Sequence, residues 1–203
     1  MRKKKTSFCK LMTMMLLPLL TASTVVSCAA SLDMSDERIA SPGPEWGVVM
    51  GSVLVRPERS APKSAATDDR FAAYEFEVVQ IQPGDPNGER AYADRYELEA
   101  VAGQERHFLS RLRPGQYLIK NFHRSGVTGT GGDLNLLFES RPGEVRYVGR
   151  VLVELPQRLS SGNEYRFAVE DGREGTLERF SKHGDLTNQA VTVPMSIRRD
   201  GTR

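Results

Sequence analysis

The sequence predicts a mostly-β protein, an antiparallel β-sandwich with one short helix near the C-terminus. Apolar and charged residues alternate with a period of two along several segments, and Pro-Gly and Gly-Asn turns separate these segments. The N-terminus has a different pattern, a basic stub followed by uncharged apolar residues. The chain therefore divides into four predicted parts: a lipoprotein signal peptide (1–27), a flexible tether (28–45), the sandwich domain (46–198) and a disordered tail (199–203).

The first 27 residues have the pattern of an export signal. Residues 1–10 carry five basic side chains and no acidic one, and residues 11–26 carry no charge. A positive stub, a short apolar run and then small residues are typical of a secretory signal. Lys and Arg beside an apolar segment resist translocation, so the stub is expected to stay in the cytoplasm.

The end of this signal resembles a bacterial lipobox. Val25-Val26-Ser27-Cys28 has two aliphatic residues, a small residue and then cysteine. The resemblance implies that Cys28 becomes the first mature residue and carries the acyl chains that attach the protein to a membrane. An ordinary cleavage site and an uncleaved anchor helix are the alternatives, and Pro18 weakens the helix. Ala29 and Ala30 follow, and the lack of Asp there favours an outer-membrane lipoprotein if the envelope is Gram-negative.

Cleavage before Cys28 changes both the charge and the cysteine content of the protein. The signal holds Cys9 and five of the 28 Lys and Arg but none of the 26 Asp and Glu, so the mature chain has 23 basic and 26 acidic residues. Its net charge is then about −3, which gives no reason to expect nucleic acid as a partner. Cys28 is its single cysteine, so we expect no disulfide.

After the signal, residues 28–44 are rich in Ser, Pro and Gly and poor in apolar residues, which predicts a tether. The clearest strand follows at 145–155, where one face is expected to hold Val145, Tyr147, Gly149, Val151, Val153 and Leu155. Strands are also expected at 48–55, 74–78, 96–99, 106–112, 117–122, 134–138, 165–170 and 191–197. Pro194 places the last at a sheet edge.

One helix is predicted after the strand at 165–170. Asp171 is expected to cap it, Glu174 to complete a capping box, and Gly184 to end it.

Two segments resemble a known type of domain. Leu112-Arg113-Pro114-Gly115-Gln116-Tyr117-Leu118 is similar to the turn and strand of carboxypeptidase-regulatory-like and transthyretin-like β-sandwiches, with Phe108 as a core aromatic. Arg141-Pro142-Gly143-Glu144-Val145-Arg146-Tyr147-Val148-Gly149 resembles a segment of bacterial lipoproteins of unknown function that contain this sandwich. The resemblance implies a fold and a cell-envelope location, but no activity and no functional residue.

The sequence shows no catalytic signature, so we expect a protein without enzymatic activity, metal or other cofactor. His107, His123 and His183 lie far apart in the chain and outside any zinc-ligand spacing, although His107 and His123 could face each other on adjacent strands. A hydrolase remains one alternative, and it predicts a pocket where a histidine meets a carboxylate. The expected function is that of a lipid-anchored envelope protein that binds a partner or has a structural role.

A module that binds glycan or lipid is the other alternative. It predicts an exposed aromatic cluster, for which the candidates are Trp46, Phe71 and Tyr92. Two groups of basic residues could also form a patch for anionic lipid or cell-wall polymer, or serve only solubility. They are Arg111, Arg113, Lys120 and Arg124 in one group and Arg141, Arg146 and Arg150 in the other.

Overall fold

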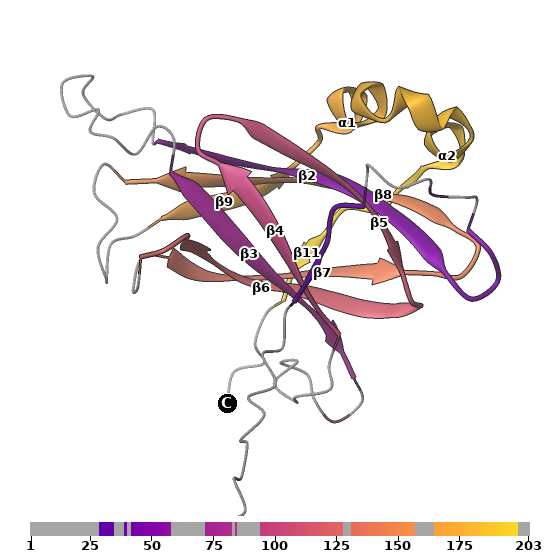
Figure 1. The fold of residues 1–203 in the computed structure, drawn as a ribbon, viewed down its shortest axis with the longest axis horizontal. Coiled ribbons are helices and arrows are strands. Elements are labelled where there is room, and N and C mark those ends of the chain that lie inside the picture. Colours follow the sequence, from indigo (N-terminus) through magenta and orange to yellow (C-terminus); the bar gives the residue numbers. More distant parts are fainter. Residues whose placement is uncertain are drawn as a thin grey trace, which may run out of the picture.

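The domain consists of two packed β-sheets with a helical layer on the outside of one of them (Figure 1). The computed structural model describes residues 29–34, 39, 42–57, 72–82, 84, 94–127, 131–156 and 165–198. The predicted mostly-β sandwich is confirmed. Two short helices near the C-terminus take the place of the single helix that the sequence predicted.

The first sheet has six strands in the order β1-β4-β3-β6-β7-β11. All neighbours are antiparallel except β1 and β4, which are parallel. The strands are β1 (Ala30–Ser31), β3 (Ala73–Ile81), β4 (Arg95–Val101), β6 (Gly115–Arg124), β7 (Gly131–Ser140) and β11 (Ser196–Ile197).

The second sheet has the order β10-β8-β2-β5, and β9 also pairs with β8. Its two central strands, β2 and β8, run parallel, which differs from the predicted antiparallel arrangement. The strands are β2 (Gly47–Pro57), β5 (Glu105–Leu112), β8 (Val145–Leu155), β9 (Arg166–Glu170) and β10 (Val191–Thr192).

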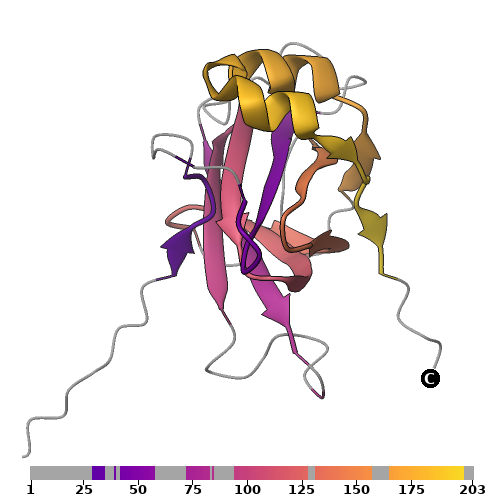
Figure 2. The same ribbon diagram turned by 90° about the vertical axis from the view of Figure 1, so that its right-hand side faces the viewer.

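Helices cover the outer face of the second sheet (Figure 2). They are α1 (Arg173–Arg179), a 3₁₀ turn (Ser181–His183) and α2 (Gly184–Gln189). Phe180 and Leu186 pack there against Val48 and Met50 of β2. Because this face meets the helices and the other meets the first sheet, β2 and β8 are buried on both sides.

The helix boundaries differ from the predicted ones. Gly172 is the N-cap of α1 without a side-chain capping bond, while Asp171 Oδ1 accepts a hydrogen bond from the Arg173 amide at 2.9 Å. The predicted capping box is therefore not formed. Gly184 follows the 3₁₀ turn and begins α2 in a right-handed helical conformation, whereas α1 already ends at Arg179.

A bulge in β8 changes which face its side chains occupy. Met50 lies opposite Tyr147 but Ser52 lies opposite Arg150, so β8 has one extra residue here. Gly149 takes up the distortion with φ of +101°, in a region that favours glycine. Val145 and Tyr147 consequently face the helices, whereas Val151, Val153 and Leu155 face the first sheet. The predicted single face is wrong for this reason.

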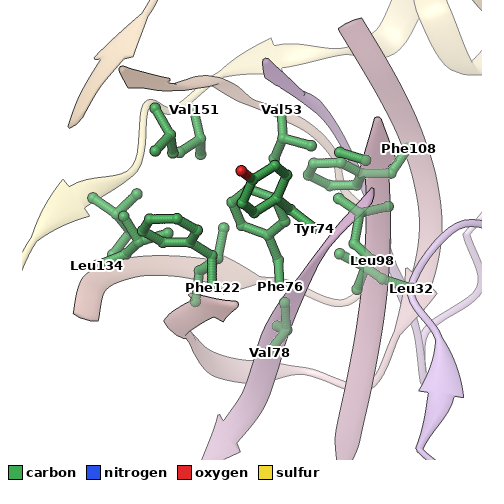
Figure 3. Packing of buried hydrophobic residues seen from close by; sticks show 14 of the residues in the cluster. Leu32, Val53, Tyr74, Phe76, Val78, Leu98, Phe108, Phe122, Leu134 and Val151 are labelled. Carbon is green, nitrogen blue, oxygen red and sulfur yellow. The ribbon is translucent and has the colours of Figure 1, made fainter. Parts of the chain in front are cut away.

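The main core lies between the sheets (Figure 3). Val53 and Val151, from the paired strands β2 and β8, lie across it from Phe76 and Phe122 of the first sheet. The rings of Phe76 and Phe122 stack with centroids 5.9 Å apart. Burial of this apolar surface stabilises the pairing of the two sheets.

The N-terminal segment closes one side of the sandwich. Leu32 N donates to Glu97 O of β4 at 2.8 Å, and Met34 N donates to Leu109 O of β5 at 2.9 Å. Between these bonds, the Leu32 side chain is 1% exposed and belongs to the main core (Figure 3). Residues 30–34 of the predicted tether are therefore part of the domain, because Leu32 fills the gap between two sheet edges.

The C-terminal segment closes the opposite side (Figure 2). Val193 N and Met195 N donate to β8, and Arg198 N donates to Asn135 O of β7. The Met195 side chain is buried in the main core where the chain passes from the second sheet to the first. As predicted, this segment lies at sheet edges, but it is divided between the two sheets.

Candidate functional site

The predicted lipidation site adjoins the first strand. Cys28 lies outside the described residues, as do the signal peptide and the tail at 199–203. Ala29 alone separates Cys28 from Ala30, where β1 begins. Ala30 pairs with Tyr96 at the start of β4. An acyl group on Cys28 would therefore be attached directly beside a hydrogen-bonded part of the domain.

Trp46 lies at the end of the sandwich where β2 begins. Its backbone accepts a hydrogen bond from Gly143 N at 2.9 Å, which joins it to the turn between β7 and β8. The guanidinium carbons of Arg111 and Arg113 lie 4.7 and 5.8 Å from the centre of its ring. Such cation–π contacts hold the two cations over the half-buried indole. Within the described residues, neither Arg111 nor Arg113 forms an ion pair.

The other arginines at this end are neutralised by carboxylates. The Arg146 side chain is 4% exposed and binds Glu139 at 2.9 Å and Glu144 at 2.8 Å. Arg141 also binds Glu139, at 3.0 Å, and its hydrogen bond is the main cause that lowers the pKa of Glu139. These arginines thus stabilise the turn and offer no free positive patch.

The two predicted basic groups do not form one surface. Arg150 is paired with Glu170 at 2.7 Å and with Glu105 at 3.5 Å. Arg113 precedes β6, whereas Arg124 is the last residue of that strand, so they lie at opposite ends of the sheet. The hypothesis of an extended basic patch is therefore wrong, and Arg111 and Arg113 remain as a separate pair.

The three histidines lie apart. His107 is on β5 and His123 on β6, which belong to different sheets, so the two do not face each other on adjacent strands. His123 binds Glu75 at 3.0 Å on the exposed face of the first sheet. His183 ends the 3₁₀ turn between the helices.

A pocket of about 640 Å³ lies beside His107. It is lined by Asp33, Glu99, Val101, Gln104, Glu105, Arg106, His107 and Arg179. The sequence did not indicate it, because its residues come from the N-terminal segment, β4, β5 and α1. No local signal could have shown this juxtaposition.

Four of the polar side chains that line the pocket have side-chain partners. Ser52 donates to Glu105 at 2.6 Å, and Arg106 binds Asp33 at 2.7 Å. His107 Nδ1 lies 3.1 Å from Thr176 Oγ1, and desolvation is the main cause that lowers the pKa of His107. Thr176 is fully buried, so its hydroxyl joins β5 to α1 and is out of reach of a substrate. The pocket thus brings His107 near carboxylates, which is the arrangement that the hydrolase alternative predicts, while the Nδ1 of His107 faces the buried Thr176 hydroxyl.

Two further features concern the described part of the chain alone. It contains no group of three or more His, Cys, Asp or Glu side chains placed to hold a metal ion. None of its helices has the length and apolar character needed to cross a membrane. Of the three candidate aromatics, Trp46 is described, whereas Phe71 and Tyr92 lie outside the described residues.

Comparison with known proteins gives little information on this chain. No family model and no curated protein matches it. A solved structure with some similarity is a leucine-rich repeat protein from Bacteroides thetaiotaomicron, with 12% sequence identity and a TM-score of 0.30. The match covers 58% of this chain and 14% of that protein, so this chain corresponds to a small part of it.

Proposed function

We propose that the protein is a non-catalytic component of the cell envelope, anchored by lipid on Cys28, that binds a partner or has a structural role. The observation that carries the proposal is the lipobox-like Val25-Val26-Ser27-Cys28, which follows an export signal and ends two residues before the first strand. Multiple acyl chains on one cysteine attach a protein firmly to a bilayer. Ala29 and Ala30 support an outer-membrane location if the envelope is Gram-negative.

The position of the anchor supports a role at the membrane surface. Leu32 is buried only four residues after Cys28, so the domain and its lipid would be held together with little chain between them.

Metabolic labelling with an alkyne-tagged fatty acid tests the proposal. The wild-type protein is expected to incorporate the label, and Cys28→Ala is expected to lose it completely. Cys9→Ala is the matched control, since Cys9 would leave with the signal peptide, and it should be labelled like the wild type. Labelling that survives Cys28→Ala, or an unlabelled wild type, would overturn the assignment of the anchor.

A further inference from the structure

The length of chain between the lipid and the fold limits how the domain sits on its membrane. One residue, Ala29, lies between Cys28 and the first residue of β1. Two residue steps span at most about 7 Å, so the lipid-bearing residue lies within that distance of Ala30. The domain then cannot turn freely over the bilayer, and one end of it is held against the lipid headgroups.

The strand directions identify this end. β1 is parallel to β4, and β4 and β6 are both antiparallel to β3, which lies between them. β1, β4 and β6 therefore run in the same direction and begin toward the same end of the first sheet, with Ala30 level with Ile119, the fifth residue of β6. The turn at Arg113 and Pro114 immediately precedes β6, so it shares this end with Cys28.

Trp46 and Arg111 lie at the same end, on the second sheet. Gly47, which follows Trp46, pairs with Leu112 of β5, and Leu112 leads into the turn at Arg113. The contacts of both arginines with the Trp46 ring confirm that these groups are neighbours. The end of the sandwich nearest the anchor thus presents one indole and two guanidinium groups without ion pairs among the described residues.

Indole and guanidinium groups suit the boundary between headgroups and acyl chains. Trp is enriched there because its ring is apolar while its N–H remains solvated. Arg binds phosphate oxygens through two parallel hydrogen bonds and keeps its apolar stem against neighbouring groups. The exposed Glu45 and the half-buried Asp94 at this end offset the two positive charges. The match to a bilayer interface therefore depends on where the indole and guanidinium groups lie more than on the net charge of this end.

We propose that this end of the domain rests on the phospholipid bilayer, with Trp46 at the interface and Arg111 and Arg113 on lipid phosphates. The surface is defined by these three residues and is called the tryptophan end below. The proposal depends on lipidation of Cys28. It assigns the opposite end of the sandwich to the aqueous side.

Trp46 is the only tryptophan of the chain and reports its own depth. The mature lipoprotein is incorporated into phosphatidylcholine vesicles, with or without bromine on the acyl chains near the headgroups. Trp46 at the interface is expected to emit less in the brominated vesicles than in the unbrominated ones, because bromine quenches an indole only at close range. Flotation of the protein with the vesicles measures anchoring separately.

The matched control is Trp46→Phe combined with Val127→Trp. Val127 is exposed and follows β6 at its far end, about 30 Å along the ten-residue strand from Gly115. This tryptophan is expected to show unchanged emission in brominated vesicles. Near-UV circular dichroism of both proteins verifies the fold.

Each outcome decides the proposal. Quenching of Trp46 but not of the tryptophan at 127, in protein that floats, supports it. Equal or stronger quenching at 127, or no quenching at Trp46, overturns the orientation while leaving the anchor intact. Protein that fails to float overturns the anchor itself and the orientation with it. Arg111→Gln with Arg113→Gln should reduce quenching of Trp46 without affecting flotation, and unchanged quenching would remove the arginines from the surface.

Discussion

Leu32→Ala tests whether the N-terminal segment is part of the fold. The Leu32 side chain is 1% exposed, at the gap between the edges of β4 and β5. Its truncation removes about 2 kcal/mol of apolar transfer free energy. With the cavity that remains, the total loss of unfolding free energy should be about 3 kcal/mol. For a domain of this size, we expect the melting temperature to fall by about 6–12 °C.

Urea unfolding of the mature protein in detergent, followed by Trp46 fluorescence, measures this change. Ser31→Ala is the matched control, because Ser31 is the exposed neighbour of Leu32 and should change the free energy by less than about 0.5 kcal/mol. If Leu32→Ala is as stable as Ser31→Ala, the segment does not close the sandwich, and the reasoning about a short anchor is refuted.

Three further predictions concern the second sheet. Gly149→Ala should reduce the unfolding free energy by about 1–3 kcal/mol in the same urea assay, because φ is +101° and a Cβ atom would lie 2.9 Å from Val169 Cγ1. Burial lowers the pKa of His107 from 6.5, so its contribution to stability is complete above pH 6.5 and is lost as the pH falls from there through the lower pKa of the folded state. Urea titrations of His107→Gln should therefore show a flatter pH dependence between pH 7.5 and 5 than those of the wild type. Arg146→Lys should lower the melting temperature measured by circular dichroism by several degrees, because a lysine cannot bind both Glu139 and Glu144 as the buried guanidinium does. An unchanged melting temperature would contradict this role of Arg146.

The strands could be predicted from the sequence because their signal is local. Alternation along 145–155 located β8 correctly. Its faces could not be read from the alternation, because the bulge at Gly149 shifts the register by one residue and exchanges the two sides. The parallel pairing of β2 with β8 also depends on contacts between residues about 100 positions apart, which no local pattern contains.

For the N-terminal segment and the candidate sites, too, the sequence predicted local motifs but not contacts between distant segments. Low apolar content predicted a tether at 28–45, yet the burial of Leu32 and the backbone bonds of Leu32 and Met34 fix its first part where two sheet edges leave a gap. The segment around Cys28 that resembles a lipobox is a local motif, so the sequence alone shows it, and lipidation there stays a prediction. The cluster of Trp46 with Arg111 and the pocket at His107 arise from distant segments and required the fold.

The central claim is that Cys28 is the lipidated first residue of the mature protein. Intact mass spectrometry of the protein extracted from membranes tests it most directly. The account predicts a mass equal to residues 28–203 plus acyl chains, and no acylated species for Cys28→Ala. A wild-type mass that retains residues 1–27, or that lacks acyl chains, would contradict the account and leave the N-terminus as an anchor helix or an ordinary export signal.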